Sequence, residues 1–388
     1  MSVRPPTRAL ALLVSVAAVC SGLVVGAGPP SATGSRVERG AHLTDCVPTG
    51  PRRTVAEINR FVDTAPGRAE FLGADVGVDV RLPRGRSLWF FADTLRRSSD
   101  EPLVRNSMLL FSPDCVQVVL APGGGAIVPE RDDGVGYWPM STWRRGPDSA
   151  PVVYLMLQRV AATTADESGS GFGFATLGPA VAVFDISPEG LPSLRQVLDL
   201  GPDDADGTIP EWGAASALDR GWLYLYGTSA RQLPGIHGFA LRVARVRPDR
   251  VLDLDGWEYW AGSSWTPDPD DAIALIPEEG GVSQTLSVWK QQGRWYALSK
   301  QDEFLGTRIV VWPGESPVGP FGPAVAVADL PCDAATGELR YMPLAHPDLL
   351  PFPDTVVVSY SRNYLSVAEV CARPLLYRPH FLRVSLPP

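Results

Sequence analysis

The stretch FLGADVGVDVRLPRGRSLWFFADT, residues 71–94, contains the pattern that decides the fold. An alternating segment, 74–82, is followed by a Pro-Arg-Gly-Arg turn and by an apolar, aromatic segment, 87–94. Alternation, a short turn with Gly and a run of aromatic residues together predict a β-hairpin. Asp75 and Asp93 lie near its open end, so the hairpin carries one carboxylate on each strand there.

Four further segments repeat this hairpin pattern. They are STWRRGPDSAPVVYLMLQ (141–158), GAASALDRGWLYLYGTS (213–229), TLSVWKQQGRWYALSK (285–300) and AHPDLLPFPDTVVVSYSRN (345–363). The five second strands begin near Ser87, Val152, Trp222, Arg294 and Thr355, which are 65, 70, 72 and 61 residues apart. A repeat of this length has room for four strands, which is typical of a propeller blade. We therefore predict an all-β, five-bladed β-propeller; a β-sandwich with chance spacing is the alternative.

The N-terminus has the features of an export signal. Arg4 and Arg8 precede an apolar run, 9–27, that ends on the small residues Val-Gly-Ala. This pattern predicts a signal peptide, and the run is also long enough for an uncleaved anchor. In either case we expect a secreted or envelope protein that meets a membrane only through its leader. The predicted domains are a leader at 1–27, an extension at 28–69 with a short helix at 53–64, and the propeller at 70–388.

Charge and cysteine content limit the partners further. The net charge of −9 argues against nucleic-acid binding. Four Cys lie beyond the leader, and in an exported chain an even number predicts disulfides. Three pairings are open, and we favour Cys46–Cys115 with Cys332–Cys371 because each pair joins near neighbours in sequence. We expect a monomer.

The chain lacks a Gly-x-Ser-x-Gly elbow, a His-Glu-x-x-His motif and a phosphate-binding loop.

Aligning the five hairpins predicts which residues meet at one mouth of the central channel. Residues facing each other across a strand pair have Cβ atoms about 5 Å apart. The predicted pairs are Asp75 with Asp93, Trp138 with Gln158, Glu211 with Thr228, Gln284 with Lys300, and His346 with Asn363.

The three acidic residues of this set suggest glycoside hydrolysis. Two neighbouring carboxylates cannot easily both ionise, so one pKa should rise. Glycosidases need one carboxyl group as acid and one as base or nucleophile. In one version Asp75 is the base or nucleophile, Asp93 tunes its pKa and Glu211 is the acid. In the other version, Asp75 and Asp93 are themselves the catalytic pair.

The remaining predicted mouth residues are candidates for substrate binding. They are Trp138, Trp212, Gln284, Lys300, His346 and Asn363. The alternative is structural: polar strand ends lead into loops, and aromatic rings commonly fill the space between blades. His346 could bind a substrate hydroxyl, a backbone carbonyl or a central structural cation. We predict no required cofactor and no residues for a metal site.

Ten short stretches from about residue 70 to the C-terminus carry a family resemblance. They are GADVGVDV, LWFFADT, WGAAS, LYLYGTS, ALRVARV, WEYWAG, SVWKQQGRWYALSK, SPVGPFGP, AHPDL and VVVSYSRN. Together they resemble secreted actinobacterial five-bladed propellers, long catalogued as a domain of unknown function, that include endo-D-arabinanases acting on mycobacterial-type cell-wall arabinan. The resemblance implies a glycan-facing funnel and chemistry at Asp75 and Asp93. The chain departs from the family pattern at Ala92, where Gly is more usual.

The sequence therefore predicts a secreted glycoside hydrolase that cuts a furanose polymer such as D-arabinan internally. The alternative is a non-catalytic carbohydrate-binding propeller of the cell surface, because one fold hosts many functions. A sialidase-like enzyme fits less well, since no repeated Ser-x-Asp-x-Gly-x-Thr-Trp motif occurs.

Overall fold

A computed structural model describes residues 41–388 except 99–100, 164–172, 232–233, 304–305 and 334. The described strands form five antiparallel sheets in chain order. The first contains β1 (His42–Leu43), β2 (Val47–Pro48), β3 (Gly73–Leu82), β4 (Arg86–Leu95), β5 (Leu103–Val104), β6 (Ser107–Phe111) and β7 (Cys115–Leu120). The second contains β8 (Gly136–Arg145), β9 (Val152–Ala162), β10 (Phe174–Ile186) and β11 (Pro192–Asp199).

The other three sheets complete the chain. The third contains β12 (Glu211–Asp219), β13 (Trp222–Ser229), β14 (Ala240–Val246), β15 (Glu258–Trp260) and β16 (Trp265–Thr266). The fourth contains β17 (Ser287–Gln291), β18 (Arg294–Lys300), β19 (Arg308–Gly314) and β20 (Val325–Asp329), and the fifth β21 (Glu338–His346), β22 (Thr355–Tyr364) and β23 (His380–Ser385). The short helices are α2 (Val55–Thr64), η1 (Leu254–Gly256), η2 (Pro269–Asp271), α3 (Val367–Ala372) and η4 (Pro374–Leu376).

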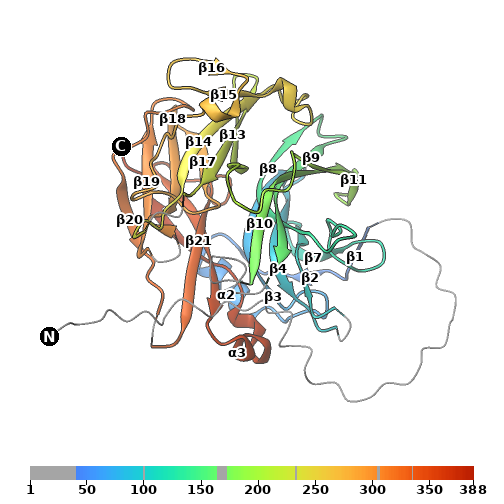
Figure 1. The fold of residues 1–388 in the computed structure, drawn as a ribbon. Helices are drawn as coiled ribbons and strands as arrows, with labels where there is room; N and C mark the ends of the chain where they lie inside the picture. The colour runs from blue at the N-terminus through green and yellow to red at the C-terminus, as the bar shows by residue number, and fades with distance from the viewer. Residues whose placement is uncertain (1–40, 99–100, 164–172, 232–233, 304–305, 334) are drawn as a thin grey trace.

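The sheets are arranged as a propeller, which confirms the predicted all-β propeller architecture. In Figure 1 they follow one another around the molecule, and the red segment around α3 lies below the blue α2 and β3. β3, β8, β12 and β17 contact one another in turn, and β21 and β22 contact β3, so the ring closes. Every predicted second strand is present, and those at Val152, Trp222, Arg294 and Thr355 begin at the predicted residue.

Hydrogen bonds between adjacent inner strands reinforce this closure. The Thr142 hydroxyl donates to the Asp79 carbonyl at 2.8 Å, and the Ser216 hydroxyl donates to the Thr142 carbonyl at 3.3 Å. On the other side of the ring, the Ala345 N–H donates to Ser287 Oγ at 2.9 Å. Short hydroxyl side chains thus satisfy backbone groups where neighbouring sheets meet.

The hydrophobic core lies between neighbouring sheets. Separate clusters join the first sheet to the second, the second to the third and fourth, and the fourth to the fifth. Phe90 of β4 meets Phe184 of β10 with ring centroids 5.8 Å apart, and Tyr224 of β13 meets Trp295 of β18 at 6.0 Å. Burial of apolar surface therefore stabilises the contacts between sheets.

The N-terminal extension packs against the junction of the first and fifth sheets. Helix α2, predicted at 53–64, begins with a capping box in which Thr54 and Glu57 each bond the other's backbone N–H. Asn59 of α2 exchanges two hydrogen bonds with the backbone of Phe381 in β23, at 2.8 and 2.9 Å. α2 thereby covers the place where the two ends of the propeller meet.

One predicted disulfide is present and the other is wrong. Cys46 and Cys115 are bonded, which ties the extension to the edge of the first sheet. Cys332 does not pair with Cys371: its sulfur lies 3.9 Å from Lys300 Nζ and 3.9 Å from the Arg340 carbonyl. Nearness in sequence favoured this pairing, but it did not fix where the two segments lie in space. The predicted leader, 1–27, lies outside the described residues, and among those described no helix is long and apolar enough to span a membrane.

Candidate active site

The starts of the inner strands place a set of polar side chains at one end of the channel. These residues are Asp75 of β3, Trp138 of β8, Glu211 of β12 and Tyr341 of β21. In each of the four strands a register shift lies next to or shortly after the named residue. Such β-bulges bend a strand and redirect its side chains, and they are common beside functional sites.

Asp75 and Asp93 lie close together, as the hairpin predicted. Register shifts before and after Val76 place Asp75 opposite the Ala92–Asp93 step of β4. Burial raises the pKa of Asp75 to about 7, with a further contribution from the negative charge of Asp93. Burial also raises the pKa of Asp93, while the Arg105 guanidinium opposes that rise.

Each of these carboxylates is held by an aromatic side chain from a neighbouring sheet. Tyr341 donates its hydroxyl to Oδ2 of Asp75 at 2.7 Å. The indole Nε1 of Trp138 donates to Oδ1 of Asp93, also at 2.7 Å. Oδ1 of Asp75, in contrast, is buried and has no hydrogen-bond partner among the described residues. An orphaned buried oxygen is unfavourable unless a ligand or water satisfies it.

Glu211 is the third carboxyl group of this set, on the third sheet. It pairs with Thr228 across the β12–β13 ladder, as predicted, and is only 6% exposed. Burial raises its pKa to about 7, against the opposing effects of Gln158 and Thr176. Within the described chain, neither Oε2 of Glu211 nor Nε2 of Gln158 has a hydrogen bond of good geometry.

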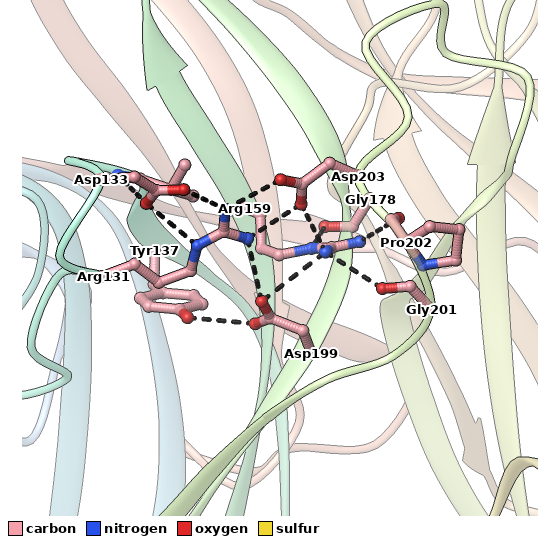
Figure 2. Close-up of polar contacts among 10 residues, drawn as sticks. Arg131, Asp133, Tyr137, Arg159, Gly178, Asp199, Gly201, Pro202 and Asp203 are labelled. Carbon is pink, nitrogen blue, oxygen red and sulfur yellow. Dashed lines mark hydrogen bonds and ion pairs between the residues drawn. The ribbon is translucent and has the colours of Figure 1, made fainter.

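A buried arginine fixes the backbone behind Glu211. Arg159, next to Gln158 in β9, is 1% exposed. Its guanidinium donates to the carbonyls of Gly178, Gly201 and Pro202 at 3.2, 3.2 and 2.8 Å, and to Asp203 at 2.7 Å (Figure 2). The φ of Gly178 is +102°, and a Cβ there would lie 2.8 Å from Nη2 of Arg159, so both the conformation and the space require glycine.

A second arginine completes this network in Figure 2. Arg131 donates to Asp199 at 3.1 Å and to the two carboxylate oxygens of Asp203 at 2.9 and 2.8 Å. Tyr137 donates its hydroxyl to Asp199 at 3.0 Å. Two arginines thus share two carboxylates, and the loop after β11 is held against the sheet that carries Gln158.

Two predicted binding residues are buried in the walls of the propeller. Trp212 is 4% exposed and belongs to a hydrophobic core cluster. Trp212 follows Glu211 directly. Because successive strand residues point to opposite faces of the sheet, Trp212 and Glu211 face opposite sides. Lys300 is fully buried at the end of β18 and donates to the Arg340 carbonyl at 2.6 Å. Both side chains are thus engaged within the protein, and their contact with substrate stays a prediction.

Gln284 precedes β17 and is half-buried. Its backbone N–H donates to the Glu303 carboxylate at 3.0 Å. The expected pairing of Gln284 with Lys300 is not part of the β17–β18 ladder, which begins with Ser287 opposite Leu298. Contact of the Gln284 amide with substrate stays a prediction.

The predicted pairing of His346 with Asn363 is wrong. β21 begins seven residues earlier than predicted, so His346 pairs with Val357, and Asn363 pairs with Leu339 at the other end of the strand. Asn363 stays beside the site, where its side chain hydrogen bonds with Tyr341.

His346 belongs to the opposite end of the channel. It is 1% exposed, and its Nδ1 and Nε2 lie 2.6 Å from Asp79 Oδ1 and 2.7 Å from Ser359 Oγ. Both ring nitrogens are thus engaged, which argues against the cation-ligand alternative. His346 and Asp79 line a cavity of about 730 Å³ that does not include Asp75, Asp93 or Glu211. Among the described residues, no group of three or more His, Cys, Asp or Glu could hold a metal ion.

Sequence reasoning did not select Tyr341 or Tyr377, although both contact Asp75. Tyr341 lies in ELRYMPLAH, where a bulge interrupts the alternation that would have marked a strand. Tyr377 follows η4 in the last connection, and no repeat pattern covers that segment. Only the three-dimensional closure of the ring brings both residues to the first sheet.

The raised pKa of Asp75 predicts how its replacement affects stability. A carboxyl group that titrates near 7 when folded and near 4 when unfolded makes folding less favourable as pH rises between these values. Asp75→Asn removes this penalty. The variant is therefore expected to exceed the wild type in free energy of unfolding above pH 7, on the order of 4 kcal/mol.

Urea denaturation at pH 4 and pH 8 measures this difference. The expected advantage of Asp75→Asn is present at pH 8 and nearly absent at pH 4. Asp348→Asn, at a side chain that is 65% exposed, is the matched control and should show no such dependence. Equal stability of Asp75→Asn and the wild type at pH 8 would contradict the burial-induced shift.

The ring of sheets and the carboxyl groups at one end of its channel define an all-β propeller with a candidate active site. The chain belongs to the DUF5005 family, a domain of unknown function whose model matches residues 61–386. No curated protein matches the chain.

One solved structure shows the same fold, and others are more distantly similar. A candidate hydrolase from Bacteroides ovatus is 18% identical with a TM-score of 0.61, and the match covers 84% of this chain and 89% of that one. A GH43_1 enzyme from Xanthomonas citri complexed with xylose is 14% identical with a TM-score of 0.46, covering 86% and 93%. A GH43 endo-arabinanase from Bacillus licheniformis is 11% identical with a TM-score of 0.41, covering 82% and 94%. Similarity at this level concerns the fold and does not establish activity.

Proposed function

We propose that the chain is a glycoside hydrolase with Asp75 as base or nucleophile and Glu211 as general acid. The observation that carries this proposal is the pair of carboxyl groups, on the first and third sheets, whose pKa values burial raises to about 7. Each has one oxygen without a partner in the described structure. Catalytic acids and bases work best when their pKa values lie near the operating pH.

Asp93 fits the role of a modulator better than that of a second catalytic group. Its Oδ1 accepts the indole hydrogen of Trp138, and the charge of Arg105 stabilises its ionised form. An ionised Asp93 beside Asp75 favours the neutral form of Asp75 and thus contributes to its raised pKa. This supports the first of the two versions drawn from the sequence.

We propose a furanose polymer such as D-arabinan as the substrate, cut internally. The support is the resemblance of stretches such as GADVGVDV and LWFFADT to secreted propellers that include endo-D-arabinanases. Trp138 is half-buried, packs edge-on to Phe174 at 4.7 Å and offers an aromatic surface beside Asp93. We further propose that the chain is an exported monomer, and that the three-stranded sheet of β21–β23 counts as a fifth blade.

Release of reducing ends from purified arabinogalactan tests this function. The wild type is expected to release oligosaccharides, whereas the double variant Asp75→Asn/Glu211→Gln should release none. Absence of products from the wild type, with the polymer retained in a pull-down, would instead favour a carbohydrate-binding propeller. If the wild type neither cuts nor binds arabinogalactan, the proposed substrate is wrong.

A further inference from the structure

We propose that Tyr341 and Tyr377 are positioning residues that hold Asp75 from one side and leave its Oδ1 free for the substrate or the attacking water. This inference rests on the proposed hydrolase function. Tyr341 comes from the fifth sheet and Tyr377 from the connection before β23, so both reach Asp75 from the far end of the chain. The orientation of the base would then depend on closure of the propeller ring.

The contacts of the two hydroxyl groups support this role. Tyr341 donates to Oδ2 of Asp75 at 2.7 Å, and the Tyr377 side chain also hydrogen bonds with this carboxyl group. Tyr341 and Tyr377 are 7% and 1% exposed. Burial raises the pKa of both phenols well above 10, so both remain protonated donors over the working pH range. Hydrogen bonds from buried donors to a carboxylate are strong and directional.

The backbone around Asp75 is held by the same two segments. The N–H of Ala74 donates to the Tyr377 carbonyl at 2.6 Å, and the N–H of Val76 donates to Ser361 Oγ of β22 at 2.9 Å. A Cβ on Gly73 would lie 2.4 Å from the Tyr377 carbonyl oxygen, so glycine lets the connection approach. Asp75 is thus fixed through its backbone and through its side chain.

Two residues beside these contacts have unfavourable backbone conformations. Val76, next to Asp75, has a φ of +66°, and Met342, next to Tyr341, has a φ of +44°. Neither is glycine, and a β-branched residue such as Val is especially rare there. Strain of this kind costs about 1–3 kcal/mol per residue and persists where the surroundings enforce it, often at functional sites. Here a strained residue directly follows each partner of the Asp75–Tyr341 hydrogen bond.

The charges and hydroxyl groups around Asp75 predict the direction in which its pKa changes when a tyrosine hydroxyl is removed. Burial and the charge of Asp93 disfavour the ionised form of Asp75, whereas the hydroxyls of Tyr341 and Tyr377 favour it. Removing either hydroxyl should therefore raise the pKa of Asp75. It should also leave the Asp75 carboxylate with one donor fewer and loosen the side chain's orientation.

The test compares Tyr341→Phe and Tyr377→Phe with Tyr226→Phe. Tyr226 is also buried, and its hydroxyl donates to the Pro317 carbonyl at 2.8 Å, away from this site. Carboxyl ¹³C NMR titration of Asp75, assigned by its loss in Asp75→Asn, measures the midpoint without any substrate. We expect the midpoint to rise by about one pH unit or less in the two site variants and to stay unchanged in the control.

Kinetics on arabinogalactan provide the second measurement. We expect kcat to fall about ten- to hundredfold in Tyr341→Phe and Tyr377→Phe, with little change in KM and with the acidic limb of the pH profile moved to higher pH. Tyr226→Phe should match the wild type. Circular dichroism identifies any variant that fails to fold. If one of the two site variants fails to fold, the other one tests the positioning role.

The two proposals fail in different ways. An unchanged Asp75 midpoint in a folded site variant would overturn the positioning role, whether or not the wild type cuts arabinogalactan. A shifted midpoint with unchanged kcat in an active enzyme would also overturn it, because the contact would then be merely structural. A shifted midpoint in a protein without activity on any polymer would support the contact but reject the hydrolase on which the catalytic role depends.

Discussion

Glu211→Gln is expected to reduce the rate of polysaccharide cleavage by about 10²- to 10⁴-fold, because the Gln amide has no acidic proton to transfer to the leaving oxygen. Glu211 is suited to this role since burial raises its pKa to about 7, which keeps much of it protonated near neutral pH. An arabinofuranoside with a 2,4-dinitrophenolate leaving group needs little protonation. Its cleavage by Glu211→Gln should therefore stay close to the wild-type rate.

The comparison of the two substrates separates acid catalysis from other effects. Thr228→Val changes the cross-strand partner of Glu211 while keeping its carboxyl group, and is the matched control. It should lower both rates by a similar, modest factor. If Glu211→Gln lowered both rates equally, Glu211 would be a structural or binding residue, and another group would have to supply the proton.

The sequence predicted the parts of the fold that depend on local pattern. A turn followed by a β-branched or aromatic run is a local signal, so the second strands at Val152, Trp222, Arg294 and Thr355 begin where expected. Asp75, Asp93 and Glu211 occupy corresponding places in their hairpins, and the structure brings Asp75 and Asp93 together for this reason. Their catalytic roles stay predictions.

The errors arise where irregular backbone or long-range contacts decide. Treating AHPDL as the start of the last hairpin placed His346 at the wrong end, since the bulge in β21 hides the true start at Glu338. Trp212 lies in a hydrophobic core cluster, an environment that its position next to Glu211 in the sequence does not reveal. Tyr377 meets Asp75 across some 300 residues of chain, and no local pattern encodes such a contact.

Arg159→Leu is expected to lower the free energy of unfolding by about 3–5 kcal/mol, because breaking a buried ion pair leaves its partners uncompensated. The substitution removes the donors to the carbonyls of Gly178, Gly201 and Pro202 and one of the two arginines that bind Asp203. Urea denaturation at pH 7 measures the loss. Arg159→Lys should recover only part of it, since one ammonium group cannot reach acceptors arranged around a planar guanidinium.

Arg195→Leu is the matched control for Arg159→Leu. Arg195 pairs with Asp185, but both side chains are about half exposed, and such surface pairs contribute about 1 kcal/mol or less. A loss in Arg159→Leu no larger than in Arg195→Leu would show that the buried network adds nothing to stability. The expected contrast would instead show that Arg159 fixes the second sheet behind Gln158 and Glu211. Because its positive charge also opposes the raised pKa of Glu211, a folded Arg159→Leu protein should hold the proton of that acid more tightly.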